Sequence, residues 1–362
     1  MQARWAHLAI VGLVPAVVYV LVLVLHRSLP GRIVDGYVRD EAGRPLRYRL
    51  NGLLVFFTTI GLWFAAGSAH FMPWDLFYVE RWTMLIGACV LGLVFSALIV
   101  FGAKGTGRGA LADFYLGRRP NPQARGVDAK MYLYLVGATL LALNLLSFAA
   151  YHLQRYRGEA SPGVILHVAL FGWFLVEYLF FEEVHLYTYD FFAERVGFKL
   201  GWGCLVFYPY FYAVGLWGTA DRPDPRAPTW LYLLATITFF GGWVLSRGAN
   251  FQKFLFKTRP GRKLLGVVPQ EAIEEGEQRL LVSGFWGLSR HINYLGEILM
   301  AVGLTLALGW PTALAPWLYP LYYVALLLPR QLDDDRRCAA KYGPLWLRYC
   351  ERVPRRIIPG LY

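Results

Sequence analysis

Charged residues are scarce in this sequence, at 17% of the 362 positions, and there are only four cysteines. The cysteines, Cys89, Cys204, Cys338 and Cys350, lack the paired spacing of metal ligands, so we expect free thiols and no metal centre. No GxGxxG run follows a predicted strand and no Walker sequence is present, which excludes the common soluble nucleotide-binding folds. Any nucleotide that this chain binds must therefore be held in another way.

Apolar and aromatic residues are abundant instead. They make up 57% of the chain, with 13 Trp, 23 Tyr and 24 Phe, and the mean hydropathy is +0.40. This composition predicts an all-α, polytopic membrane helix bundle whose aromatic residues lie at the bilayer interfaces. The net charge of +12 gathers in a few connecting segments, as in cytoplasmic loops of membrane proteins, so we expect a lipid bilayer and no nucleic acid as partner.

Runs of about 20 apolar residues mark the predicted membrane spans. They cover residues 6–25, 51–69, 82–102, 131–150, 163–181, 200–218, 229–246, 296–310 and 312–329. Residues 281–295 are too short and polar to cross alone and are predicted to be re-entrant or interfacial, which gives a count of about nine to ten spans. We divide the chain into an N-terminal bundle, residues 1–246, and a C-terminal half, residues 247–362.

Basic residues and turn residues organise the connecting segments. Lysines and arginines of residues 104–130, residues 247–263 and the C-terminal tail fall on one side of the predicted bundle, which we assign to the cytosol. Residues 29–52 are punctuated by glycine and proline and alternate in polarity, which predicts a short hairpin or a plain loop at the membrane surface.

Acidic residues gather at the end of the fifth predicted span. Glu177 lies inside an apolar run, and Glu182, Glu183 and Asp190 follow it. A carboxyl group in low dielectric has a raised pKa and can hold a proton at neutral pH, so Glu177, Glu182, Glu183 and Asp190 are candidates for a general acid. An ordinary interfacial position remains the alternative for the last three acids.

Polar groups that suit a phosphorylated cofactor cluster in the C-terminal half. Lys253 and Lys257 are four residues apart, so both lie on one helix face and can bind one polyanion. The run GLSRHINYLGE supplies Arg290, His291, Asn293 and Tyr294, and the tail supplies Arg330, Asp334 and Tyr349. Arginine binds phosphate in a bidentate manner, and aromatic rings can stack on a base. An interfacial helix bound to anionic lipid is the alternative interpretation of the tail.

The segments LPGRIVDGYVRDEAGRPLRYRLNG, NFQKFLFK, LLVSGFWGLSRHINYLGE and DDRRCAAKYGPLWLRYCERVPRRIIPGLY together resemble the integral-membrane sterol reductase family, which reduces Δ14, Δ7 or Δ24(28) double bonds. The resemblance covers nearly the whole chain and is densest after residue 250. It implies a ten-helix bundle, an NADPH pocket that faces the cytosol and a sterol that enters from the membrane. The implied cofactor contacts are Lys253, Lys257, Leu281, Trp286, Asn293, Arg330, Asp334 and Tyr349, with Arg290, His291 and Tyr294 in the same motif.

Three departures from the family pattern affect these expectations. Lys257 stands where the family usually has arginine, GRRPNP replaces GRELNPR, and Leu175 and Tyr178 stand where the family has a tyrosine and an aspartate. We therefore add Tyr178 to Glu177, Glu182 and Asp190 as candidate proton donors.

The sequence thus predicts an NADPH-dependent sterol reductase in which an acid protonates the alkene and the nicotinamide delivers a hydride to the resulting carbocation. The membrane is that of the endoplasmic reticulum or a bacterial inner membrane. An S-adenosylmethionine-dependent membrane methyltransferase of the isoprenylcysteine or phospholipid type is the main alternative, and a sterol-binding receptor without catalysis is a third.

Overall fold

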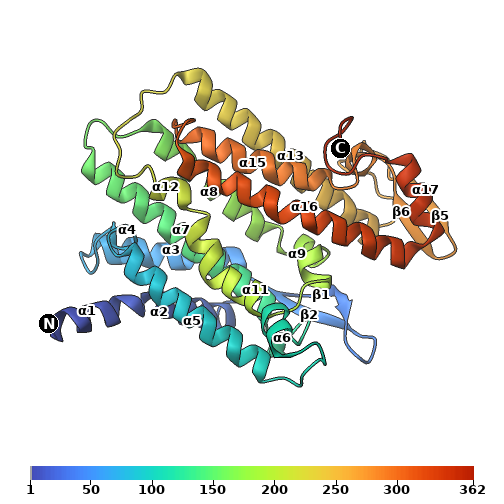
Figure 1. The fold of residues 1–362 in the computed structure, drawn as a ribbon, viewed down its shortest axis with the longest axis horizontal. Coiled ribbons are helices and arrows are strands. Elements are labelled where there is room, and N and C mark those ends of the chain that lie inside the picture. Colours follow the sequence, from blue (N-terminus) through green and yellow to red (C-terminus); the bar gives the residue numbers. More distant parts are fainter. Residues whose placement is uncertain (1) are drawn as a thin grey trace. The chain divides into compact units, whose positions relative to one another are not determined.

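The computed structural model describes residues 2–362, which form two compact units, Met1–Asp224 and Pro225–Tyr362. Figure 1 traces both along the chain. The first unit contains α1 (Gln2–Gly12), α2 (Val14–Ser28), β1 (Arg32–Arg39), β2 (Pro45–Leu50), α3 (Gly52–Ser68), α4 (Leu76–Val79), α5 (Arg81–Phe101), α6 (Ala110–Leu116), β3 (Gln123–Ala124), β4 (Val127–Asp128), α7 (Ala129–Arg155), α8 (Pro162–Phe180), α9 (Glu182–His185), α10 (Tyr189–Phe192), α11 (Phe198–Trp202), the π-helix η1 (Gly203–Phe211) and α12 (Val214–Trp217). The second unit contains α13 (Thr229–Thr258), β5 (Ala272–Glu275), β6 (Gln278–Leu281), α14 (Phe285–Leu288), α15 (Ile292–Ala307), α16 (Leu314–Tyr342) and α17 (Pro344–Arg352).

Helix α7 is the core of the first unit. Within its apolar window 78% of the residues are buried, against 28% in α5, because α2, α3, α4, α8, α12 and η1 all pack on α7. The Asp128 carboxylate caps the start of α7 by accepting hydrogen bonds from the backbone N–H groups of Lys130 and Met131, at 3.0 and 3.1 Å. The capped, buried helix is the frame on which the rest of this unit is assembled.

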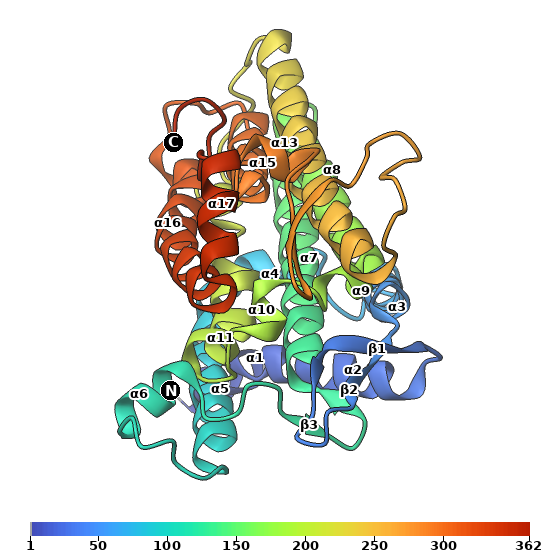
Figure 2. The same ribbon diagram turned by 90° about the vertical axis from the view of Figure 1, so that its right-hand side faces the viewer.

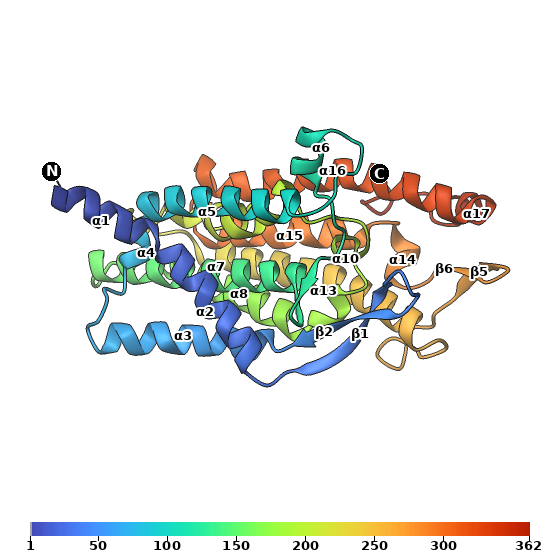
Figure 3. The same cartoon turned by 90° about the horizontal axis from the view of Figure 1, so that it is seen from below.

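Two predicted elements of the first unit differ in outcome. The predicted surface hairpin is confirmed: β1 and β2 pair in antiparallel fashion from Arg32↔Leu50 to Arg39↔Pro45 and connect α2 to α3 (Figure 3). The predicted single span over residues 200–218 is instead divided into α11, η1 and α12. Pro209 lies inside η1, where Asn144 of α7 donates a hydrogen bond of 2.8 Å to the Pro209 carbonyl oxygen and so satisfies a group of the widened turn.

Three long helices dominate the second unit. α15 packs closely on α13 and also on α16, while α17 follows a turn at Gly343 and lies beside α16 (Figure 2). Residues 281–295, predicted to be re-entrant or interfacial, contain the short helix α14 and the start of α15 at Ile292, and their position relative to a membrane remains a prediction. The predicted span 312–329 is the first part of α16, which continues as one helix to Tyr342.

The helical membrane architecture is confirmed in outline. Within residues 2–362, five helices are long and apolar enough to cross a bilayer: Trp5–Ser28, Arg81–Phe101, Ala129–Arg155, Pro162–Phe180 and Thr229–Thr258. Gly52–Ser68 and Ile292–Ala307 are shorter apolar helices. These lengths support a multi-pass membrane protein, while the count of about nine to ten spans remains a prediction. The three short hairpins β1–β2, β3–β4 and β5–β6 correct the all-α expectation only slightly.

Candidate active site

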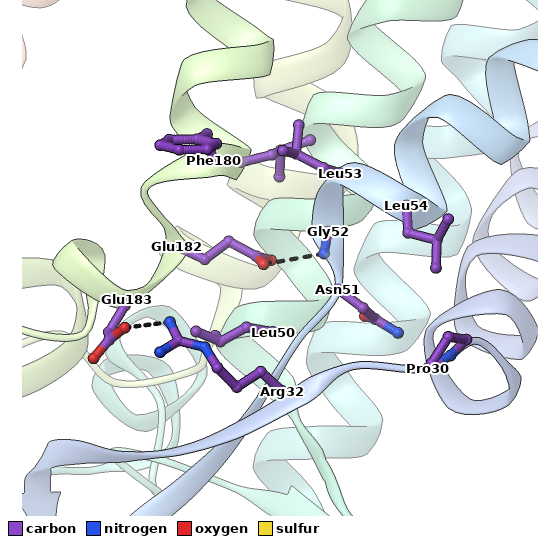
Figure 4. A pocket seen from close by; sticks show the side chains of 11 residues that line it. Pro30, Arg32, Leu50, Asn51, Gly52, Leu53, Leu54, Phe180, Glu182 and Glu183 are labelled. Atoms are coloured by element: carbon purple, nitrogen blue, oxygen red, sulfur yellow. Dashed lines mark hydrogen bonds and ion pairs between the residues drawn. The ribbon is translucent and has the colours of Figure 1, made fainter.

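A pocket of about 300 Å³ in the first unit contains the Glu182 carboxyl group (Figure 4). The pocket forms where β1 begins, where β2 runs into α3 and where α8 ends. Leu53 and Phe180 lie on one side of Glu182 and Arg32 on the other (Figure 4). The full lining is Pro30, Arg32, Leu50, Asn51, Gly52, Leu53, Leu54, Leu179, Phe180, Glu182 and Glu183. The lining of the pocket is therefore apolar on one side and polar on the other.

Glu182 is the one residue of this pocket whose protonation is strongly perturbed among the described residues that line it. Its side chain is only 8% exposed, and burial raises its pKa from 4.5 to about 7, although the Gly52 N–H donates a hydrogen bond of 3.0 Å to its carboxylate and opposes that shift. A carboxyl group with this pKa holds a proton on about half of the molecules at neutral pH. Glu182 can therefore act as an acid under physiological conditions.

Gly52 and Arg32 define the surroundings of Glu182. A Cβ atom on Gly52 would lie 2.3 Å from the Glu182 Oε1 atom, so only glycine leaves room for the carboxyl group. The neighbouring Glu183 forms an ion pair with Arg32 of β1 and is the more exposed of the two glutamates, with 33% of its side chain accessible. Two adjacent glutamates thus occupy different environments, one enclosed and one paired at the surface.

The other predicted acids lie along the same stretch but do not line this pocket. Glu177 is buried on α8, and Tyr178 stacks on His185 with ring centroids 4.0 Å apart. Asp190 lies in the first turn of α10, where its backbone carbonyl oxygen accepts a hydrogen bond of 2.8 Å from the Lys130 ammonium group. Lys130 also donates to the carbonyl oxygens of Phe191 and Glu194. Lys130, expected to be a loop charge, is therefore a fully buried clamp on α10.

The second unit gathers the predicted cofactor residues. Lys253 lies on α13 with its ammonium group 5.2 Å from the centroid of the Trp286 ring, a cation–π contact. Lys257, one turn further along α13, lies within electrostatic range of Lys253, Lys341 and Asp334. Three lysines close together repel one another unless an anion lies among them. This group is therefore suited to a phosphate.

Helix α13 also fixes the segment that carries Trp286. The Gln252 side chain accepts a hydrogen bond of 3.0 Å from the Phe285 N–H and donates one of 3.1 Å to the Ser283 carbonyl oxygen. The Trp286 indole N–H donates to the Ala249 carbonyl oxygen at 2.8 Å. These three bonds hold the indole beside the lysines, a role for Gln252 that the sequence did not reveal.

Asp335 of α16 binds the segment that carries Arg290, His291, Asn293 and Tyr294, which we call the RHxNY motif. The Asp335 carboxylate lies 3.2 Å from the His291 Nε2 atom and 3.7 Å from the Arg290 guanidinium, with Arg356 at 3.5 Å. Burial alone would raise the pKa of Asp335, but the hydrogen bond with His291 and the nearby positive charges hold it below its usual range. Asp334, the acid predicted from sequence, lies 3.9 Å from the His291 Nδ1 atom and is 21% exposed.

Aromatic residues of α17 complete the group. The Tyr349 hydroxyl donates to the Trp286 carbonyl oxygen at 3.3 Å, and the Tyr349 ring lies 5.1 Å from that of Trp346. Leu281 ends β6 and is buried, and Tyr294 stacks on His291 with centroids 5.0 Å apart. Arg330 is half-buried on α16, four residues before Asp334. The predicted cofactor residues thus all lie in one unit, most of them in direct contact with another member of the set.

Asn293 is incompletely hydrogen-bonded. Its amide nitrogen is 3.4 Å from the Asn250 side-chain oxygen, while its own side-chain oxygen is buried and has no hydrogen-bond partner among residues 2–362. A buried polar atom without a partner costs free energy, so this oxygen is available to accept a hydrogen bond from a ligand.

Comparisons with known proteins identify the family of this chain. The model of the ergosterol biosynthesis ERG4/ERG24 family matches residues 8–362. A delta(14)-sterol reductase from Arabidopsis thaliana is 32% identical over 95% of this chain and 94% of its own length. Enzymes of the same name from Methylotuvimicrobium alcaliphilum and Mus musculus are 31% and 32% identical, each over 92% of this chain and over 79% and 81% of their own lengths. The predicted resemblance to sterol reductases is confirmed, and the methyltransferase alternative finds no support in these relatives.

Proposed function

This chain belongs to the ergosterol biosynthesis ERG4/ERG24 family, and on that premise we propose that it reduces the C14–C15 double bond of a membrane-dissolved sterol with NADPH. The observation that carries the choice of double bond is the similarity along 95% of the chain to a relative named delta(14)-sterol reductase. The choice of NADPH rests on the lysines of the second unit, since Lys253 lies beside the Trp286 ring and lies, with Lys341, within electrostatic range of Lys257, a grouping that suits a dinucleotide with an additional phosphate.

The residues of the second unit fit NADPH. Lys253, Lys257 and Lys341 would neutralise phosphate charge, and Trp286 and Tyr349 would offer aromatic surface to a base. The Asn293 side-chain oxygen, buried without a partner in the described chain, would accept a hydrogen bond from the cofactor. NADPH, when bound, supplies the hydride for the reduction.

The proton of the reaction is assigned to Glu182 within this proposal. Of the four predicted donors, Glu182 lines a pocket and has a pKa of about 7, so it is partly protonated where the enzyme works. The Gly52 N–H fixes the direction of the carboxyl group, and the apolar residues Leu53, Leu54 and Phe180 line the same pocket. Glu177, Tyr178 and Asp190 do not line this pocket.

The cofactor proposal is tested on the purified protein in detergent with a sterol that carries a C14–C15 double bond. We expect a reduced sterol, identified by mass spectrometry, with NADPH, and much less with NADH. Lys253→Ala should raise the KM for NADPH by about tenfold or more, as expected from the loss of a charged hydrogen bond. Lys263→Ala is the control, because Lys263 is exposed and follows α13. Equal use of both reductants, or methyl transfer from S-adenosylmethionine, would refute the proposal.

The proton donor is tested by Glu182→Gln, which keeps the shape of the side chain and removes the acid. We expect kcat to fall by about 100-fold or more, the usual contribution of general acid catalysis. In the unaltered enzyme kcat should decline as pH rises past about 7, because Glu182 then loses its proton. Glu183→Gln is the matched control. Full activity of Glu182→Gln would remove Glu182 from this role and leave the reductase assignment intact.

A further inference from the structure

Gln331 interrupts an otherwise apolar stripe on α16. The buried positions of this helix are Pro316, Tyr319, Pro320, Tyr323, Leu327 and Gln331, and all but the adjacent Tyr319 and Pro320 follow one another at intervals of three or four residues, as on one helix face. An apolar side chain is expected at the sixth position. The sequence instead places a carboxamide there, with none of its surface exposed.

Neither polar atom of Gln331 is satisfied within the chain. Its side-chain oxygen and nitrogen are both buried and have no hydrogen-bond partner among residues 2–362. By contrast, the buried Gln252 uses both of its amide atoms, one toward Phe285 and one toward Ser283. Two unpaired polar atoms in the interior oppose folding, and a leucine would avoid that cost. Retaining an amide here is therefore explained best by a ligand.

The register of α15 and α16 places Gln331 beside the cofactor residues. The Thr305 hydroxyl donates to the Pro316 carbonyl oxygen at 2.8 Å, and His291 bonds Asp335 at 3.2 Å, so the two helices run antiparallel with these pairs near opposite ends. Gln331 lies one turn before Asp335 and hence level with the first turn of α15. Asn293, which has the other unpaired amide oxygen, is in that turn.

We propose that Gln331 recognises the carboxamide of the nicotinamide ring, through its buried amide group at the level of Asn293 between α15 and α16. This inference rests on the proposed NADPH dependence. A primary amide carries an acceptor and donors side by side, and a second primary amide matches it with two hydrogen bonds. A hydroxyl group would satisfy only one of the two atoms at ideal geometry. Gln331 is a positioning residue in this account, since rotation of its flexible side chain presents the amide to the ring.

The test measures binding by tryptophan fluorescence on the full-length protein in detergent, with Gln331→Leu as the variant. The ligands are NADPH, its acetylpyridine analogue, which keeps the carbonyl and lacks the amide N–H group, and adenosine 2′,5′-bisphosphate, which lacks the nicotinamide. We expect Gln331→Leu to raise the Kd for NADPH about tenfold, as for two neutral hydrogen bonds, and to leave the Kd for the bisphosphate unchanged. The analogue should bind the unaltered protein more weakly than NADPH and lose less on substitution.

Thermal unfolding of the ligand-free protein separates recognition from a structural role. Gln331→Leu should keep or raise the Tm, because it removes two unpaired buried atoms. Gln331→Glu, which has no donor when ionised, is the second variant and should also weaken NADPH binding. Gln154→Leu, at an exposed position of α7, is the control.

Three results would overturn the proposal: an unchanged Kd for NADPH, equal losses for NADPH and the bisphosphate, or a lowered Tm with NADPH binding intact, which would indicate a buried water held by Gln331. If the unaltered protein binds neither NADPH nor the bisphosphate, the proposed NADPH dependence itself fails. The two failures are therefore distinguishable.

Discussion

At the scale of residues, the sequence predicts which residue types lie together, but it does not predict the contacts and burial of each side chain. Lys253, Trp286, His291 and Tyr349 meet in one unit, as expected from their motifs, because a motif constrains residue types that act together. The sequence predicts Asp334 and does not single out Asp335, because consecutive aspartates have the same local pattern. The structure places the Asp335 carboxylate 3.2 Å from the His291 Nε2 atom, while the Asp334 carboxylate lies 3.9 Å from the His291 Nδ1 atom.

The sequence does not predict which of the charged side chains are buried. Glu182 and Glu183 are adjacent and were expected to behave alike, yet contact with Gly52, more than 120 residues away in the chain, encloses the first, while Arg32 pairs with the second. Lys130 was expected to lie in an exposed loop, but the fold places its ammonium group against three carbonyl oxygens of residues 190–194. Such contacts between distant segments leave no local pattern.

The raised pKa of Glu182 makes protein stability depend on pH. The native carboxyl group has a pKa of about 7 against 4.5 in an ordinary environment, so the folded state binds the proton more tightly than the unfolded state. The resulting stabilisation is full below pH about 4.5 and is lost as pH rises through about 7; for this shift it amounts to at most about 3 kcal/mol.

Glu182→Gln should therefore be more stable than the unaltered protein above pH about 7, with the difference shrinking as pH falls. The measurement is the Tm in detergent between pH 5 and 8, with Glu183→Gln as reference. Parallel pH profiles for Glu182→Gln and the unaltered protein would show that Glu182 is not a group that titrates on folding.

At the scale of elements, glycines set how closely α13 and α15 approach. A Cβ atom on Gly242 would lie 2.6 Å from the Gly296 carbonyl oxygen, and one on Gly296 would lie 2.5 Å from that of Gly242. Small residues at such crossings allow backbones to pack closely, as is common between membrane helices. Because α13 carries Lys253 and α15 carries Asn293 and Tyr294, this crossing also positions the proposed cofactor residues.

Gly242→Ala should lower stability, by about 1–3 kcal/mol, because the added methyl group forces two backbones apart. Gly241→Ala is the matched control one position away, since a Cβ atom there meets nothing within 4 Å. The Tm of both variants in detergent checks the expectation. Equal Tm values for the two variants would show that the crossing tolerates a wider spacing.

Element boundaries were predicted well where hydropathy changes sharply and poorly elsewhere. The predicted span 82–102 became Arg81–Phe101, and 163–181 became Pro162–Phe180. The prediction for α16 stopped at residue 329, where the apolar run ends, although the following Arg, Gln, Leu and Ala residues are good helix formers and carry the helix to Tyr342. Hydropathy marks where a bilayer could end, and helices need not end there.

At the scale of the whole molecule, the match to one family of enzymes includes both units of the chain. The family model covers residues 8–362, so both the acid pocket of the first unit and the lysine group of the second lie within the matched region. The helical membrane fold and the family could be predicted because long apolar runs and C-terminal motifs are local features, while the binding of a cofactor by the C-terminal residues remains a proposal. The Glu182 pocket could not, because it is built from three segments that only the fold brings together.

The central claim is that hydride passes from NADPH to a sterol with a C14–C15 double bond. It is tested most directly by incubating the purified protein with NADPH that carries deuterium at the transferable position of the nicotinamide, and by analysing the sterol by mass spectrometry. We predict that the reduced product gains one deuterium from the cofactor and one hydrogen from the solvent. A reduced product without deuterium, or no reduced product at all, would contradict the account.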